Sequence, residues 1–449
     1  MWSVSLALAF ALAPAPDCGQ PDAPPNPRCG EALDGRQPAP EPGSPAARAV
    51  LAVPGAGAHL VLLPVIKTSE VVEKYDVPGH LRAILTTDDG LVGARPELTY
   101  TSGFIPSAGL RLFYGRLPGA SFATTRFLTA GQNVLLGEVS LRGPPRSGLD
   151  LAASWSRRRD RLYAGIGPAS EAELAAMGQG IARYAADIGR LGLRWTSPRE
   201  RVIRLDAGSD FEWRNYDGND VRNGPPVTAL FGAPADACAA SGLAAPCVDP
   251  LLVPGFDTGR RLLRQRARLA LDLRDHQRDG DGVEVAFDAT YGRGIMGDPT
   301  QLVRLGFDTV GAIGGHDRAL VLRGQAAVVQ PLAGTVVPFD EMISAAGINT
   351  MRGFPEGRFR DRSAVVGTVE WRWLVAARID ASLFSDVGAV AGPWFADLRR
   401  SSFYTSVGAG LRLYELAQPQ HWQAGGAWGA QVAYSPESGF RLMVSAAAF

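Results

Sequence analysis

Apolar and polar residues alternate strictly along many stretches of this 449-residue chain. The segment from 363 to 373 has apolar side chains at Val365, Val369, Trp371 and Trp373 and polar ones at Thr368, Glu370 and Arg372. A period of two places these side chains on opposite faces of a β-strand. The same alternation recurs in 201–216, 264–274, 283–291 and 378–387, where the polar face carries dense charges of both signs. This pattern predicts an all-β fold, a transmembrane antiparallel β-barrel with an apolar outer surface and a wet lumen.

A water-soluble β-sandwich is the alternative, because its strands also alternate. Its turn signals, however, come every 8–12 residues, and it rarely needs a strand as long as 201–216. Repetition of the charged face in strand after strand favours the barrel.

The pattern divides the chain into about sixteen strands, an even number as expected for a bacterial single-chain barrel. We expect them at 93–102, 108–117, 119–128, 132–142, 148–165, 181–195, 200–216, 260–274, 281–292, 301–312, 317–330, 363–374, 377–390, 403–415, 426–435 and 439–449. Both ends of the barrel sequence then lie on one side, together with the short turns 196–199, 313–316 and 375–376. The long connections, including 217–258 and 331–362, lie on the other side.

We assign the barrel to residues 93–449. The residues before it divide into three parts. Residues 1–16 read as an export signal with a short apolar core and small residues at Ala13 and Ala15. No basic residue precedes that core, so a disordered tail or a misplaced start codon is the alternative. Residues 17–56 read as a disordered linker rich in Pro, Gly and Ala. We expect residues 57–92 to form an N-terminal extension or plug segment.

Composition narrows the function classes. The chain has 45 basic and 45 acidic side chains, and this neutral balance argues against a nucleic-acid binder. No uncharged apolar run reaches the ~18 residues of a membrane-spanning helix. The 53 glycines and 33 prolines suit a chain with many turns.

The cysteines and histidines do not indicate a catalytic or metal site. Cys238 and Cys247 lie in a Pro-, Gly- and Ala-rich connection, where their short separation predicts a disulfide formed in an oxidising compartment. Two free thiols are the alternative, and Cys18 and Cys29 could also pair. The five histidines are scattered without metal-ligand spacing, so we expect no metal and no cofactor. With neither a Gly-x-Ser-x-Gly elbow nor a usable Ser/His/Asp grouping, we expect no enzyme.

A polar loop with six charges, residues 349–362, leads into the strand at 363. An arginine on such a loop can make bidentate hydrogen bonds to carboxylates on the polar faces of neighbouring strands. Gly353 permits close backbone approach, and Pro355 stiffens the chain beyond it. The loop could act as a brace for a large barrel or as a moving gate, and the two roles are compatible.

Three segments together resemble the BamA/TamA family of outer-membrane barrels, also called bacterial surface antigen proteins. They are Met351-Arg352-Gly353-Phe354, the segment 364–370, and Phe384-Ser-Asp386-Val-Gly388. The resemblance implies that the tetrapeptide folds back into the lumen. Arg352 would then contact the acidic residue of the motif that contains Phe384, Asp386 and Gly388, and Glu370 takes the family's acidic position on the intervening strand.

The resemblance also implies a function. We expect a non-enzymatic, multi-pass protein of the bacterial outer membrane that helps to insert or translocate proteins, or lipids, by opening at the seam between its first and last strands. Its partners would be outer-membrane lipid and lipopolysaccharide, protein or lipid substrates, and the cell's own barrel-assembly machinery that inserts it; no nucleic acid is expected, and the chain would be a monomer. The alternative is a passive porin-like channel, whose lumen would be lined by Arg264, Arg266, Arg268, Asp206, Asp210 and Glu284.

Two features depart from the family pattern. The stretch between 50 and 91 is too short for a complete periplasmic POTRA domain, so the chain resembles the barrel-only branch. The last strand keeps an aromatic signal residue at Phe449 but has Ala447 where an aromatic is usual.

Overall fold

The computed structural model describes residues 84–87, 91–118, 121–143, 148–197, 202–274, 282–315, 318–376, 379–414 and 427–447. The predicted signal 1–16, the linker 17–56, most of the segment 57–92 and the C-terminal Phe449 lie outside these residues.

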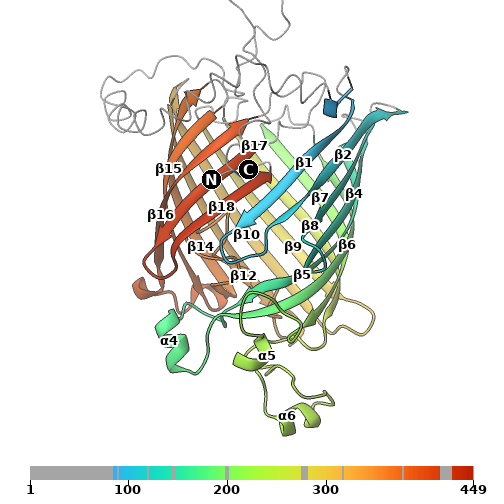
Figure 1. Ribbon diagram of the computed structural model, residues 1–449, viewed down its shortest axis with the longest axis vertical. Coiled ribbons are helices and arrows are strands. Elements are labelled where there is room, and N and C mark those ends of the chain that lie inside the picture. Colours follow the sequence, from blue (N-terminus) through green and yellow to red (C-terminus); the bar gives the residue numbers. More distant parts are fainter. Residues whose placement is uncertain are drawn as a thin grey trace, which may run out of the picture.

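Sixteen antiparallel strands close into one barrel, which confirms the predicted fold class (Figure 1). The strands are β1 (Val92–Thr101), β2 (Ser107–Leu117), β3 (Ser121–Thr129), β4 (Val134–Arg142), β5 (Leu149–Tyr163), β6 (Ala182–Thr196), β7 (Ile203–Asp217), β8 (Arg260–Asp272), β9 (Gly282–Gly294), β10 (Gln301–Gly315), β11 (Arg318–Pro331), β14 (Ser363–Ala376), β15 (Ile379–Ala391), β16 (Tyr404–Tyr414), β17 (Ala427–Ser435) and β18 (Gly439–Ala447). Each pairs with its neighbours in sequence, and β18 returns to β1. The remaining strands, β12 (Ile343–Ser344) and β13 (Arg360–Asp361), form a separate small sheet between β11 and β14.

The two faces of the strands differ as the alternation predicts. In β7, Ile203 is 56% exposed on the outer surface, whereas Asp210 and Glu212 are buried on the inner face. Leu269 and Phe287 continue the exposed apolar surface on neighbouring strands. Residues of one parity thus build an apolar belt, and those of the other build a charged lumen.

The connections after β5, β7, β11 and β15 lie at one end of the barrel, because these strands run in the same direction. Three short helices belong to this end: α4 (Glu171–Ala176), α5 (Val227–Leu230) and α6 (Ala235–Ala240) (Figure 1). The 3-10 turns η2 (Pro393–Phe395) and η3 (Arg400–Ser402) lie in the connection between β15 and β16. No helix among the described residues is long and apolar enough to cross a membrane.

Helix α4 begins with a capping box. The backbone N–H of Glu173 donates to the Ser170 hydroxyl at 3.3 Å, and the Ser170 backbone N–H donates to the Glu173 carboxylate at 2.7 Å. This backbone hydrogen bond, together with one from the Ser170 hydroxyl, lowers the pKa of Glu173.

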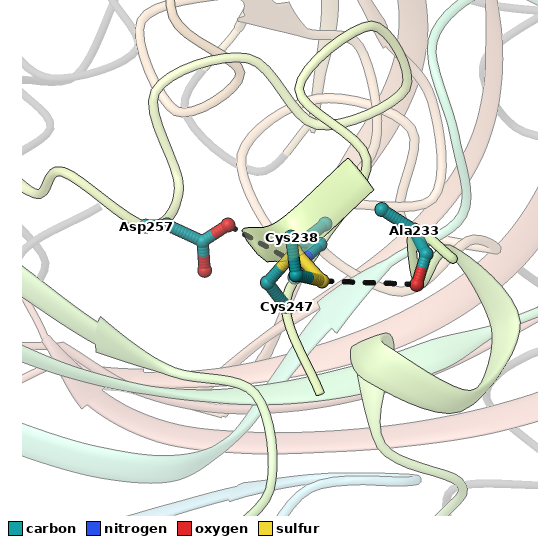
Figure 2. Close-up of a disulfide and its surroundings, with 5 residues drawn as sticks. Ala233, Cys238, Cys247 and Asp257 are labelled. Atoms are coloured by element: carbon teal, nitrogen blue, oxygen red, sulfur yellow. Dashed lines mark hydrogen bonds between the residues drawn. A yellow bond between two sulfur atoms is a disulfide. The ribbon is translucent and has the colours of Figure 1, made fainter. Parts of the chain in front are cut away.

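The connection between β7 and β8 is closed by the disulfide Cys238–Cys247, which confirms that prediction (Figure 2). Cys238 belongs to α6, and Cys247 precedes Val248, whose backbone N–H donates to the Asp257 carboxylate at 3.2 Å. Both sulfur-bearing residues are buried within the connection. The bridge therefore restrains a segment that has little regular structure of its own.

We expect the double substitution Cys238→Ser with Cys247→Ser to lower the free energy of local opening of this connection by about 2–3 kcal/mol, from the entropy of a closed loop of this size. Hydrogen exchange of the α6 amides would measure the change. Exchange in the double variant as slow as in the native protein would show that packing alone orders the segment.

Candidate functional site

The connection between β11 and β14, residues 332–362, folds back into the barrel; we call it the inward loop. Its apolar residues Met351, Phe354 and Phe359 are buried in one cluster with wall residues from β10, β11, β14 and β15. Phe354 and Phe359 pack edge to face with ring centroids 5.1 Å apart. Met351 and Phe354 of the Met-Arg-Gly-Phe tetrapeptide are therefore held by apolar packing on either side of Arg352.

Arg352 lies between the two carboxylates that the sequence singled out. Its Nη2 and Nε donate to the Asp386 carboxylate at 2.8 and 3.0 Å, and its Nη1 donates to Glu370 Oε2 at 2.8 Å. The Arg352 backbone N–H also donates to Asp386, at 3.0 Å. The guanidinium lies over the Phe384 ring, 3.3 Å from its centroid. Arg352, Glu370 and Asp386 are 5%, 1% and 0% exposed, so water does not screen this first anchor of the inward loop.

The carboxylates of the first anchor have further partners on the barrel wall. Glu370 accepts hydrogen bonds from Arg372 at 2.6 Å and from Arg412 at 2.5 Å. Asp386 accepts one from the Thr368 hydroxyl at 2.9 Å. Glu370 is thus bonded to two wall arginines in addition to Arg352. Asp386 is bonded to Arg352 and to no other arginine among the described residues.

Glycines at two positions permit this close packing. A Cβ on Gly353 would lie 2.4 Å from Ser406 Cβ, and one on Gly388 would lie 2.8 Å from Met351 Sδ. The Gly353 backbone also bonds to the wall: its N–H donates to the Ser406 hydroxyl at 3.2 Å, and its carbonyl accepts from the Ser435 hydroxyl at 3.1 Å.

We expect Gly388→Ala to destabilise the barrel by about 1–3 kcal/mol, the usual cost of overpacking a dense interior. Unfolding in urea, followed by the gel mobility of the folded species, would measure it. Gly137→Ala is the matched control, because nothing lies within 4 Å of a Cβ at that strand position. Equal losses in the two variants would contradict the close contact with Met351.

The structure adds a second anchor that the sequence analysis missed. Asp340 accepts a hydrogen bond from Arg214 at 2.5 Å and is ion-paired with Arg260. Glu341 accepts one from Arg260 at 3.0 Å and another from Arg264. Burial alone would raise the pKa of Asp340, but the charges of Arg260 and Arg214 outweigh it and lower that pKa.

An aromatic cluster surrounds the residue that precedes this anchor. Phe339 is completely buried among the rings of Tyr163, Tyr184, Tyr216 and Phe256, whose centroids lie 5.0–5.6 Å from its own. Because Phe256 belongs to the disulfide-closed connection, this cluster joins that connection to the inward loop. The inward loop therefore spans the lumen from β7 and β8, at its second anchor, to β14–β16, at its first.

The seam between the first and last strands is short. Among the described residues, β1 and β18 pair at three positions: Thr99 with Ser445, Tyr100 with Val444, and Thr101 with Met443. By contrast, β1 and β2 pair at every position from 92 to 99, and β10 and β11 from 302 to 315. One residue beyond β1, Ser102 extends the joint, since its backbone N–H donates to the Leu442 carbonyl at 2.9 Å.

A residue from before the barrel occupies part of the edge that β18 leaves free. Thr86 forms an antiparallel bridge with Gly93 of β1. Because Phe113 of β2 already pairs with Gly93 on one side, Thr86 lies on the other side, where β18 joins β1 further along. A Cβ on Gly93 would lie 2.4 Å from Thr86 Cγ2, so glycine suits this approach.

The rest of the lumen contains a cavity of about 990 Å³ lined by charged side chains of both signs. The lining includes five of the six residues predicted for a channel lumen, Arg264, Arg266, Arg268, Asp206 and Asp210. The sixth, Glu284, is ion-paired with Arg268 at 3.5 Å. In the described part of the chain, no group of His, Cys, Asp and Glu side chains is arranged to hold a metal ion.

Comparisons with known proteins agree with this architecture. Residues 260–415, from β8 to the end of β16, match the family model of the Omp85 superfamily domain. No curated protein sequence matches the chain. Among solved structures, BamA from Haemophilus ducreyi lacking POTRA domains 1–3 superposes with a TM-score of 0.52 at 12% identity, covering 79% of this chain and 70% of that one.

Two further structures are CdiB proteins. CdiB from Acinetobacter baumannii gives a TM-score of 0.46 at 12% identity and covers 79% of this chain and 59% of its own. CdiB from Escherichia coli gives 0.45 at 14% identity, with 78% and 62% covered. The chain therefore forms a closed β-barrel of 16 strands with the fold of BamA, and residues 260–415 of that barrel match the Omp85 superfamily domain.

Proposed function

We propose that this barrel helps to insert or translocate proteins, or lipids, at the bacterial outer membrane by opening between β1 and β18. The match to the Omp85 superfamily domain supports this class of function, because barrels of that superfamily are non-enzymatic insertases or transporters. The observation that carries the mechanism is the seam, which pairs at three described positions in a barrel whose other joints are much longer.

Opening at the seam would break fewer backbone hydrogen bonds than opening anywhere else. Each ladder hydrogen bond contributes about 0.5–1.5 kcal/mol net in water and more in lipid, where its groups have no other partner. Separating β10 from β11, which pair from 302 to 315, therefore costs far more free energy than separating β1 from β18, which pair at three described positions. An opened seam would present the edges of β1 and β18, which an incoming strand can pair with.

The inward loop supports this mechanism as a brace. Its two anchors hold β7 and β8 to β14–β16 across the lumen, and neither anchor contacts β1 or β18. Arg358 of the same loop pairs with Glu437 in the turn between β17 and β18, so the loop also ties the β18 side of the seam to this wall. The strands from β7 to β17 can thus stay together while β1 parts from β18. The brace role agrees with the full burial of Arg352, and a moving gate would have to break that buried network first.

A cysteine staple across the seam tests the proposal. Thr101→Cys with Met443→Cys places two thiols on directly opposed residues of β1 and β18. In proteoliposomes, we expect the oxidised variant to lose its ability to accelerate insertion of an unfolded barrel substrate, and reduction to restore it. Ser140→Cys with Ala152→Cys is the matched control, because it staples β4 to β5, away from the seam. Full activity of the oxidised seam variant would exclude opening at this joint.

A passive channel is the second candidate, favoured by the large charged cavity in the lumen. Ions could cross a wet lumen of this kind. Steady conductance of the pure protein in planar bilayers, unchanged by the seam staple, would favour the channel over the insertase.

A further inference from the structure

A second cavity, of about 430 Å³, lies between the inward loop and the wall formed by β1–β6. Its volume falls within the range of roughly 300–1,000 Å³ that is usual for ligand sites. Thr99 and Thr101 of β1 and Met443 of β18 line one side, so the cavity lies directly behind the seam.

Large apolar side chains form part of this lining, beside charged ones. Leu128, Val134 and Leu136 contribute from β3 and β4, and Phe354 contributes from the inward loop. Leu128, Val134 and Phe354 are buried side chains that border the empty space. Such a surface favours an apolar ligand over water.

Two arginines in the same lining lack an acidic partner. Arg161 has its Nε buried without a hydrogen-bond partner, and its guanidinium forms no ion pair with any described residue. Arg360 is 8% exposed and donates to the carbonyls of Phe339 and Leu162 at 3.2 and 3.3 Å, while its Nε has no hydrogen-bond partner. The rings of Tyr163 and Phe339, with centroids 5.3 and 5.5 Å away, face this guanidinium but carry no negative charge. A buried guanidinium without a carboxylate is costly unless an anion compensates its charge.

The other charges of the lining do not cancel this excess. Arg126 is compensated by Glu97 at 2.5 Å, and Arg158 by Asp160 at 3.0 Å. Glu356 is the acidic side chain of the lining, and it is exposed. The cavity therefore combines a net positive charge with an apolar wall.

The end of the seam nearest the cavity is also basic. Arg183 donates to the Gly103 carbonyl at 2.8 Å, and Arg441 donates to the Ser102 carbonyl at 2.5 Å. Both guanidiniums are buried beside the turn that follows β1. An anion that passes the end of the seam would meet these two positive charges on its way to Arg161.

We propose that this cavity is a binding site for a single-chain anionic amphiphile, whose acyl chain lies along Leu128, Val134 and Leu136 and whose head group pairs with Arg161 and Arg360. A fatty acid and a lysophospholipid share this chemistry. The volume suits one chain, and an intact two-chain lipid would enter with one chain only. The inference stands on the cavity itself and does not require the insertase function.

Native mass spectrometry of the full barrel in a neutral detergent tests the proposal. We expect one copy of myristoyl lysophosphatidylglycerol or myristate to bind, and neither the uncharged monomyristoyl glycerol nor glycerol phosphate to compete. Preference between the two anionic probes would distinguish a phosphate from a carboxylate head group. Equal binding of monomyristoyl glycerol would overturn the proposal.

Substitutions locate the site. Arg161→Gln should weaken binding about tenfold, the effect of losing one charge-assisted hydrogen bond. Leu136→Trp should abolish it by filling the space, and Glu356→Gln should strengthen it. Arg304→Gln is the matched control, because Arg304 lines the other cavity and has no partner among the described residues. Unchanged binding in both Arg161→Gln and Leu136→Trp would overturn the assignment. Because the assay contains no insertion step, its failure is separate from failure of the proposed function.

Discussion

Replacing Arg352 with alanine should lower the stability of the barrel by about 3–5 kcal/mol, the usual cost of breaking a buried ion pair. The loss arises at Asp386, which would keep the Thr368 and Ser406 hydroxyls and the backbone N–H of residue 352 but lose the positive charge of the guanidinium that donates to it twice. Glu370 would suffer less, because Arg372 and Arg412 remain bonded to it. Reversible unfolding in urea, with the folded fraction followed by gel mobility, would measure the change.

The controls separate charge from bulk. Arg352→Lys should recover part of the loss, because an ammonium keeps the charge but cannot form the fork across Asp386 and Glu370. Arg304→Ala removes a lumen arginine without a described partner and should change stability by less than about 0.5 kcal/mol. A loss in Arg352→Ala no larger than that in Arg304→Ala would show that the first anchor contributes little.

The double substitution Asp340→Asn with Glu341→Gln should have a comparable effect, again about 3–5 kcal/mol. It would leave the buried Arg260 and Arg264 and the partly buried Arg214 in one region. Glu212 would remain ion-paired with Arg214 and Arg264, whereas Arg260 would keep no acidic partner among the described residues. The repulsion should free this end of the inward loop. Proteolysis at the inward loop should then become faster. The urea concentration at the midpoint of unfolding should also fall.

Glu356→Gln is the matched control for this second anchor. Glu356 lies on the same loop, is exposed, and forms no ion pair in the part of the chain that the structure describes. Its removal should leave protease resistance unchanged. Because the two anchors share no residue, combining Asp340→Asn and Glu341→Gln with Arg352→Ala should add their effects. Resistance in the Asp340/Glu341 variant equal to that of Glu356→Gln would rule out the second anchor as a restraint.

Alternation alone could place the strands, because one residue in two must face lipid and the other the lumen. Even Pro96, which weakens the pattern near the start, lies within β1, a strand whose edge β18 leaves partly unpaired. Boundaries shifted by a few residues: 375–376, expected as a turn, ends β14. Trp371 and Trp373 share the parity of exposed Val369 but are buried, stacked on each other at 4.2 Å.

The contacts between distant segments were harder to predict. The partners of Arg352 could be named because the resemblance to the BamA/TamA family implied them, from the motifs that contain Arg352, Glu370 and Asp386. Asp340 and Glu341 carried a weaker signal, an acidic pair on a long loop, and the sequence does not say which of many strand arginines faces them. The seam length depends on the stagger of two strands that lie at opposite ends of the barrel sequence, which alternation does not specify.

During folding, the seam differs from every other joint between neighbouring strands of the barrel. Most neighbouring strands are hairpins that close over short distances along the chain, whereas the seam joins Thr101 to Met443. Loop-closure entropy rises with the length of chain enclosed, so pairing of β1 with β18 should come last, after a curved sheet has brought the two edges together. Biogenesis of the barrel would then end at the same joint that the proposed function opens.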